Sequence, residues 1–183
     1  MSMSGHRLRR MLANSGEPPP TEIGQAYGGG FYYGDITIGG VEYYLVIADK
    51  SAEATRQWKT ENSLSPGTDS TVDGWYNTNN MNNALHPAAK YCRDYRGGGF
   101  SDWYLWAPEE FDVAYANIRP NGTNTPTIFK SGNDQALGSD TNFWTSFEAG
   151  SGAAMARFIR STSYVNASKT TNHYARPIRR VRK

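Results

Sequence analysis

The chain has 183 residues, the length of one ordinary domain with a short extension. Its 13% of aromatic and 38% of hydrophobic residues exclude a disordered chain and predict a packed core. No segment approaches the roughly 18 apolar residues of a membrane span. The first 30 residues lack the apolar stretch of a secretory signal, and the single Cys92 excludes an internal disulfide framework and a cysteine-cluster zinc site.

Basic residues gather at the two ends of the chain. The formal net charge is only +2, yet residues 1–16 carry three arginines and residues 176–183 carry five basic residues, both without an acid. The residues between them are mildly acidic. A basic end of this kind is typical of a solvated tail, of a peptide that docks on an acidic protein surface, or of a nucleic-acid contact.

The sequence predicts an N-terminal arm, residues 1–24, before a single folded domain, residues 25–183. Over Gly5–Ala13 three apolar residues recur at helical spacing beside the arginines, in a segment too short to be a stable helix alone. Pro18–Pro20 would act as a stiff, extended spacer. We expect the arm to dock on another protein through Arg7, Leu8, Arg9, Arg10, Met11 and Leu12.

A β-hairpin is predicted at the start of the domain. Phe31–Ile38 and Val41–Ala48 are rich in β-branched and aromatic residues and flank Gly39-Gly40, which suits a two-residue turn. Pairing Ile38 with Val41 sets the register. One face, expected to be the core face, would then hold Tyr32, Ile36, Ile38, Val41, Tyr43, Leu45 and Ile47.

The next region is predicted to be a long loop and a helix. Residues 49–82 are polar and irregular, and we expect their aromatic residues to pin the loop to the body. A helix should run from Pro87 to about Arg96, where Gly97 ends it. Cys92 lies on its apolar stripe with Ala88 and Tyr95, so we expect a buried structural thiol and not a nucleophile.

A second helix is predicted from Pro108. Its first turn carries Glu109, Glu110 and Asp112, and we interpret these acids as compensation of the helix dipole and not as an acid–base pair. Apolar residues recur at the helical period and should face the core: Phe111, Ala114, Tyr115 and Ile118.

The last third alternates loops with short strands. Loops are expected over residues 119–142 and 161–172, and strands over Phe143–Phe147, Ala154–Ile159 and Tyr174–Arg182. Pro177 implies an edge position or a bulge in the last of these. The predicted fold class is therefore α+β, with an antiparallel sheet, two helices and long loops.

Four motifs occur in order: Gly98-Gly99-Phe100-Ser101-Asp102-Trp103-Tyr104-Leu105, a predicted helix with Glu110-Phe111, Phe143-Trp144-Thr145-Ser146, and Ala175-Arg176-Pro177-Ile178-Arg179. Over about residues 25–182 the chain thereby resembles the C-type-lectin-like domain that ends the collagen-like-protein family of bacterial surface proteins. Similar modules occur in phage tail-fibre and other virion proteins, and the opening Ala26–Phe31 with its hairpin resembles the phage versions. Trp106 departs from the family, which usually has proline there.

The resemblance implies a C-type-lectin-like scaffold, in which we expect Arg176 to pair with Asp102. The loop motifs of a calcium-dependent sugar site are missing, and no cluster of oxygen ligands replaces them, so we expect no bound metal and no cofactor. The three histidines are scattered and no nucleophile–base pattern occurs, so we expect no catalytic residues and no enzyme activity. The body is not basic, which argues against nucleic-acid binding.

Two classes of function remain. The first is a phage virion structural protein, assembled in the host cytoplasm, whose arm docks on other virion proteins and whose body projects outward. It could be a tail-fibre or tail-tip component that binds a host glycan or protein, or a capsid decoration protein (cement or head fibre). The second is a bacterial surface adhesin, which the missing secretory signal argues against.

A fibre tip would present aromatic and amide side chains on its loops, because aromatic faces stack on sugar rings and amides both donate and accept hydrogen bonds. The alternative is that these loops only tolerate variation. We also expect a homo-oligomer, a trimer by analogy with symmetric virion assemblies. The candidate ligand-binding residues are Trp58, Trp75, Tyr76, Asn121, Asn124, Asn133, Tyr164, Asn166 and His173.

Overall fold

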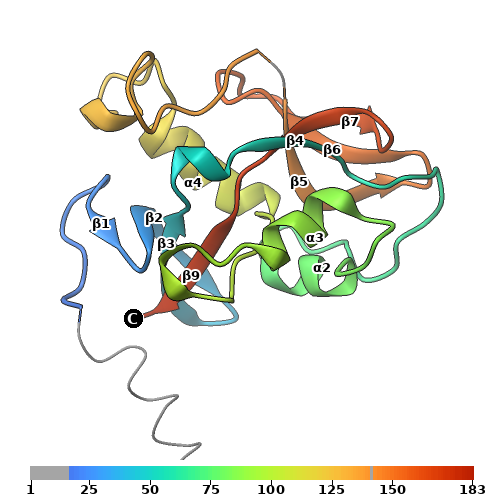
Figure 1. Cartoon of the computed structure of the whole chain (residues 1–183), viewed down its shortest axis with the longest axis horizontal. Coiled ribbons are helices and arrows are strands. Elements are labelled where there is room, and N and C mark those ends of the chain that lie inside the picture. The colour runs from blue at the N-terminus through green and yellow to red at the C-terminus, as the bar shows by residue number, and fades with distance from the viewer. Residues whose placement is uncertain (1–16, 141) are drawn as a thin grey trace, which may run out of the picture.

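The computed structural model describes residues 17–140 and 142–183, whose strands form two sheets (Figure 1). The predicted docking residues of the arm lie outside this range. The first sheet has the order β1-β2-β3-β9 and is antiparallel throughout, with strands Ala26–Tyr27, Gly30–Ile38, Val41–Ile47 and Ile178–Arg182. The second has the order β4-β8-β5-β6-β7, with β4 Ala54–Gln57, β5 Phe143–Gly150, β6 Ala153–Arg157, β7 Val165–Ser168 and β8 Asn172–Ala175.

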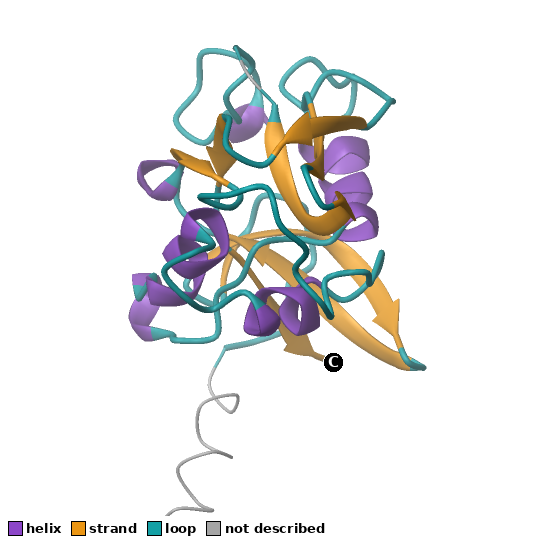
Figure 2. Cartoon of the chain, turned by 90° about the vertical axis from the view of Figure 1, so that its right-hand side faces the viewer, coloured by secondary structure: helices purple, strands orange, loops and turns teal. Residues whose placement is uncertain are grey.

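Within the described residues, three α-helices accompany the sheets: α2 (Gly74–Asn80), α3 (Pro87–Asp94) and α4 (Pro108–Ile118). Short 3-10 turns occur at Lys50–Ala52 (η1), Gly97–Gly99 (η2) and Thr127–Phe129 (η3). Figure 2 shows helical segments on both sides of the strands. The α+β class is confirmed. The prediction of one antiparallel sheet with two helices is wrong, because residues 17–140 and 142–183 form two sheets, β5 and β8 run parallel, and α2 is a third helix.

The predicted hairpin is present, and Ile38 pairs with Val41 as expected. One assignment to its core face is wrong. The register shifts between Tyr32 and Gly34, so that Tyr32 pairs with Val46 and lies on the opposite face from Ile36. A bulge inserts one residue and thereby exchanges the faces of everything beyond it. Tyr33, at the bulge, is instead fully buried in the main core.

Aromatic residues form much of the core. Trp106 is completely buried, with its ring 4.6 Å from that of Phe111 and its indole N–H donating to the Trp144 carbonyl at 2.7 Å. This main core fills the space between the two sheets and the helices. A smaller cluster covers the other face of the first sheet and contains Tyr27, Tyr32, Val46, Ala48, Ala52, Trp103 and Val181.

The basic C-terminal segment is part of the fold and not a tail. The strand expected over Tyr174–Arg182 is broken at Arg176-Pro177, so that β8 lies inside the second sheet and β9 at the edge of the first. Arg176 is fully buried where the chain crosses between the sheets. Its guanidinium donates to the Ala48 carbonyl at 2.9 Å and to Gln135, and it lies 3.7 Å from Glu53.

The expected pairing of Arg176 with Asp102 is wrong. Arg179 is the partner of Asp102, through two hydrogen bonds of 2.8 Å. Arg176 lies before the proline, and the break turns its side chain into the region between the two sheets. The β9 residue Arg179 projects toward the smaller aromatic cluster, where Asp102 lies beside Trp103.

Two glycine runs that carry the family resemblance meet in space. Gly98 has a φ of +64°, and a Cβ at this position would lie 2.3 Å from the Cα of Gly29. Only glycine permits both this backbone conformation and this close approach. The contact fixes the loop 97–102 against the start of β2, which positions the segment that runs beside β9.

Both predicted helices are present, as α3 and α4, but α3 is shorter than expected and one acid of α4 has a further role. The first ends at Asp94 and not near Arg96, and Cys92 is fully buried in it, which raises the pKa of its thiol. Glu110, in the second, is also fully buried, so dipole compensation is not its whole role. Its carboxylate accepts hydrogen bonds from the Tyr104 hydroxyl at 2.6 Å and from the Ala107 N–H at 2.7 Å.

Candidate functional site

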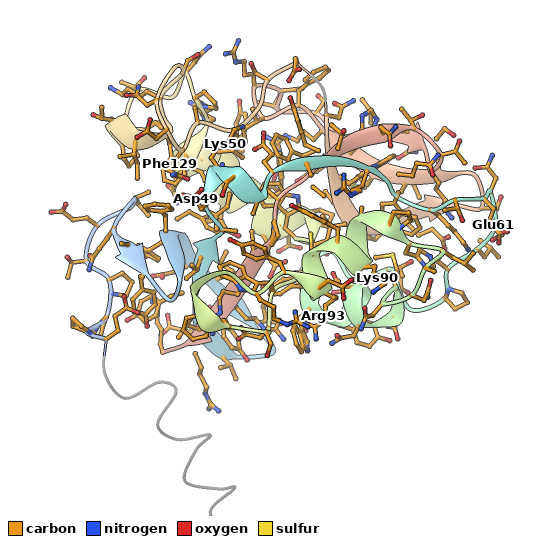
Figure 3. The ribbon with its side chains drawn as sticks, viewed as in Figure 1. Asp49, Lys50, Glu61, Lys90, Arg93 and Phe129 are labelled. Carbon is orange, nitrogen blue, oxygen red and sulfur yellow. The ribbon has the colours of Figure 1, made fainter. Side chains whose placement is uncertain are left out.

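A basic and aromatic groove follows the outer side of β9. On one side of it lies the loop 99–102, and on the other lie Trp75 of α2 and Tyr43 of β3. Figure 3 shows Arg93, near the end of α3, at the lower surface of the molecule. The groove consists of two adjoining hollows, of about 660 and 200 Å³, which share Trp75, Asp102, Arg180 and Arg182. Its lining comprises Tyr43, Trp75, Arg93, Gly99, Phe100, Ser101, Asp102, Tyr104, Arg179, Arg180, Val181 and Arg182.

The groove exists because a neighbouring segment pairs with β9 only at one residue. The Tyr104 N–H donates to the Ile178 carbonyl at 2.8 Å, and the Ile178 N–H donates back at 2.9 Å. No further backbone hydrogen bond joins residues 99–103 to β9 in the described part of the chain. The segment diverges from β9 beyond this bridge, and the gap between them is the groove.

Alternation along β9 determines which of its backbone groups face the groove. The Pro177 carbonyl accepts from the Ala48 N–H, and the Lys183 N–H donates to the Glu42 carbonyl, so these two groups point toward β3. Ile178 bonds in the opposite direction, outward to Tyr104. In an antiparallel ladder such bonding alternates between successive residues. The N–H and C=O groups of Arg180 and Arg182 therefore point outward, like those of Ile178, but without a described backbone partner.

Two of the four arginines of the groove are neutralised by carboxylates. Arg179 pairs with Asp102, donates to the Gly28 carbonyl at 2.9 Å and covers the Phe100 ring at 3.8 Å. Arg180 pairs with Asp73 at 2.8 Å. These pairs fix the two guanidinium groups in place.

The other two arginines make no ion pair with any described residue. Arg93 lies 4.2 Å from the centre of the Trp75 ring and donates to the Trp103 carbonyl at 2.9 Å. Its Nε–H is buried without a hydrogen-bond partner among the described residues. Arg182 is exposed at the end of β9. The groove therefore has an excess of positive charge.

Most of the predicted ligand-binding residues lie elsewhere. Trp58 is buried, with its indole N–H on the Thr145 carbonyl at 2.9 Å, and His173 is 8% exposed against the Trp144 ring, so both are core residues and not loop contacts. The Tyr164 hydroxyl donates to the Pro108 carbonyl at 2.6 Å and thereby ties its loop to α4. The remaining predicted residues are Trp75, Tyr76, Asn121, Asn124, Asn133 and Asn166.

Those six residues do not converge on one site. Tyr76 on α2, the three asparagines of the loop 119–142 and Asn166 on β7 are exposed, but Figure 1 shows these elements in separate parts of the molecule. Of all the predicted ligand-binding residues, only Trp75 lines the groove. The four arginines of the groove were not predicted as a site. The basic segment 176–183 pointed to Arg179, Arg180 and Arg182, but nothing in the sequence pointed to Arg93.

A buried polar network around His86 was also not predicted from the sequence. The His86 Nε2 lies 2.7 Å from the Ser65 hydroxyl, and Nδ1 lies 2.8 Å from the Asn83 side-chain oxygen. Because that oxygen only accepts, Nδ1 carries the proton and Nε2 accepts from Ser65. Burial and the nearby Lys59 and Lys169 ammonium groups lower the His86 pKa to about 4, so the ring is neutral at neutral pH.

The network joins loops and is closed to solvent. Ser65 is only 5% exposed, and its hydroxyl also receives a hydrogen bond from the Lys59 ammonium at 3.2 Å. Lys169, fully buried, pairs with Glu148 of β5, which in turn accepts from the Ser65 N–H at 2.8 Å. This arrangement holds the loop 59–65 between α3 and the second sheet.

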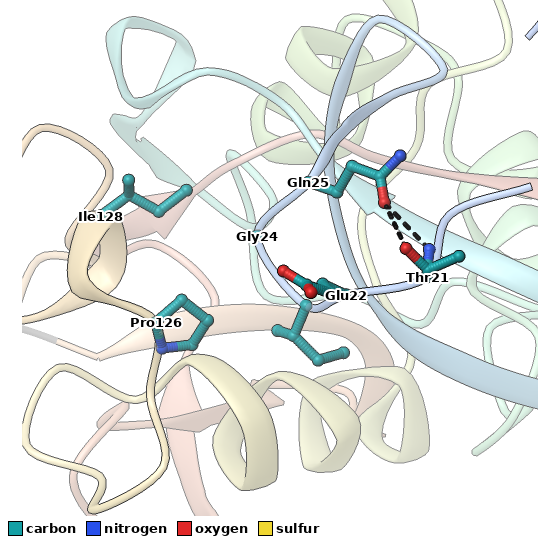
Figure 4. Close-up of a pocket in the computed structure, with 7 residues that line it drawn as sticks. Thr21, Glu22, Gly24, Gln25, Pro126 and Ile128 are labelled. Atoms are coloured by element: carbon teal, nitrogen blue, oxygen red, sulfur yellow. Dashed lines mark hydrogen bonds between the residues drawn. The ribbon is translucent and has the colours of Figure 1, made fainter. Parts of the chain in front are cut away.

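A second surface hollow lies where the start of the described chain meets the loop 119–142 (Figure 4). Pro126 and Ile128 form one wall and residues 21–25 the other. The Thr21 N–H and hydroxyl both donate to the Gln25 side chain, at 2.9 and 3.3 Å, so these polar groups satisfy one another. With Glu22 as its single charged residue, this hollow has less to offer a ligand than the groove beside β9.

Within residues 17–140 and 142–183, no three His, Cys, Asp or Glu side chains gather closely enough to hold a metal ion. The helices of that same part of the chain are all too short or too polar to cross a bilayer. In comparisons with known proteins, no protein-family model matches this sequence, and no curated protein matches it either.

Proposed function

We propose that the chain is a phage virion structural protein, a tail-fibre or tail-tip component that recognises the host surface. The observation that carries this proposal is the groove beside β9, which is lined by two arginines without ion-pair partners and by several half-buried aromatic side chains. Buried charged groups elsewhere bond within the fold: Arg176 donates to the Ala48 carbonyl, and Lys169 pairs with Glu148. The groove is thus the surface best equipped to bind a ligand.

The arm has a separate role in this proposal. Residues 7–12 combine arginines with apolar side chains and would dock on another virion protein, whereas the described body begins with Glu17, which accepts a hydrogen bond from the Gly28 N–H at 2.8 Å. Attachment and recognition would then belong to different parts of the chain. We propose a trimer, placed in the virion after assembly in the host cytoplasm.

Binding of the purified full chain to cells of the host bacterium tests the recognition role. Arg182→Glu should reduce the cell-bound fluorescence of the labelled chain, because it reverses an exposed charge in the groove. Arg160→Glu is the matched control, since Arg160 is an exposed arginine outside the groove. Equal binding of the two variants and the unchanged chain would contradict a recognition role for the groove and favour the capsid decoration alternative.

A further inference from the structure

The outer edge of β9 is an open strand edge inside a positively charged groove. Arg180 and Arg182 direct their backbone N–H and C=O groups away from β3, and the bridge to Tyr104 ends at Ile178. Edge strands are usually covered or blocked, because their free backbone groups accept a further strand. Here the segment 99–104 pairs with β9 only through the bridge between Tyr104 and Ile178. The backbone of β9 from Arg180 onward is not paired with this segment.

The side chains around this edge select for an acidic partner. Arg180 and Arg182 are two residues apart on one strand, so their side chains lie on the same face, beside Trp75. Arg93 adds a further guanidinium from α3, with an unpartnered buried Nε–H. The carboxylates of Asp73 and Asp102 are already taken by Arg180 and Arg179. The charge that remains to be matched is therefore positive.

We infer that the groove binds an extended, acidic peptide segment of a protein partner, which adds to β9 as a further strand. The backbone of the segment would bond to Arg180 and Arg182, and a carboxylate on its groove-facing side would lie beside Arg182 and Arg93. Alternate residues of a strand share one face, so acids at every second position fit this arrangement best. The chain's own arm does not fit, because its arginines would repel those of the groove.

This inference rests on the proposed function, since it names the chemistry of what the recognition surface binds. Strand addition has a signature that binding to side chains lacks. The amide protons of Arg180 and Arg182 point away from β3 and have no described backbone partner in the free chain. In the complex they become hydrogen bonded and exchange more slowly. A polysaccharide held by the guanidinium groups would leave them exchanging.

Amide hydrogen exchange of the full chain, followed by nuclear magnetic resonance, is the test. The probe is the peptide acetyl-Thr-Glu-Val-Glu-Thr-amide, compared with the same peptide carrying Gln for both Glu residues and with polygalacturonate as an acidic saccharide. We expect the acidic peptide to slow exchange at Arg180 and Arg182 at least tenfold, and the Gln peptide to bind more weakly. Slowed exchange with neither peptide overturns the inference, whether or not polygalacturonate binds.

Two variants separate charge from backbone. Arg182→Gln should weaken peptide binding about two- to fivefold, the range of one exposed ion pair. Arg182→Pro also removes the outward N–H, which an edge strand tolerates, and should weaken binding further. Equal affinities of these two variants would contradict strand addition. A chain that is absent from virions but shows this peptide binding would instead contradict the proposed function alone.

Discussion

The neutral, buried His86 makes the stability of the fold depend on pH. Its pKa is lowered from 6.5 to about 4, first by burial and then by the Lys59 and Lys169 ammonium groups. In the unfolded chain the ring takes up its proton near pH 6.5, whereas the folded chain resists protonation until about pH 4. The contribution of His86 to stability is therefore complete above pH 6.5 and is lost as the pH falls toward 4.

The size of the effect follows from the shift. Each unit of pKa difference corresponds to about 1.4 kcal/mol, so the fall to a pKa of about 4 removes on the order of 3 kcal/mol between pH 7 and pH 4. That is a substantial part of the total stability of a domain of this size. The variant His86→Gln has no proton to take up and should lack this part of the pH dependence.

Urea unfolding followed by tryptophan fluorescence, at pH 7, 6, 5 and 4, measures this difference. His86→Gln loses hydrogen bonds at every pH, so the quantity to compare is the slope of unfolding free energy against pH and not its value at one pH. We expect the unchanged chain to lose stability more steeply than the variant between pH 6.5 and 4. Parallel curves for the two proteins would refute the assignment of a neutral, buried ring.

Glu110 should contribute in the opposite direction, because burial raises its pKa to about 7. Its own contribution to stability is lost as the pH rises from 4.5 to 7, and Glu110→Gln should remove that contribution in the same urea titration. Gly98→Ala should lower the free energy of unfolding by more than about 2 kcal/mol, because its Cβ meets the Gly29 backbone. Gly39 also has a positive φ but open space around it, so Gly39→Ala should lower the free energy of unfolding by only about 1 kcal/mol. Equal losses would contradict the close approach of Gly98 to Gly29. Deleting residues 1–16 should leave the thermal unfolding of the body intact but abolish incorporation into particles, and normal incorporation would show that the arm is not the anchor.

The hairpin and the starts of two helices could be predicted, because short sequence motifs determine them. Gly39-Gly40 between two β-rich runs gave the hairpin and its register, and Pro87 and Pro108 marked the first positions of two helices. The bulge at Tyr33 has no such signal, so Tyr32 was assigned to the wrong face.

Helix α2 was missed because its sequence, Gly-Trp-Tyr-Asn-Thr-Asn-Asn, lacks an apolar period. It is stabilised by tertiary hydrogen bonds instead. Asn77 and Thr78 are fully buried and bond to the Ser70 and Leu105 carbonyls at 2.7 and 3.1 Å. The contact between Thr78 and Leu105, 27 residues apart, cannot be inferred from the local pattern.

The groove could not be predicted for the same reason. It combines the end of β9 with Tyr43, Trp75 and Arg93, which come from three separate elements. The sequence showed that residues 176–183 are basic, but not that Arg176 and Arg179 are enclosed while Arg182 stays exposed. The break at Pro177 determines which of these arginines are enclosed, and it depends on the positions of both sheets.

The most direct test of the proposed function is to locate this chain in a cryo-electron microscopy map of the purified virion. We expect density for the body at the tail fibre or tail tip, joined to the particle through residues 1–16, with the groove beside β9 facing outward. Density on the capsid surface would contradict the recognition role in favour of decoration. A particle without this chain would contradict the virion assignment itself.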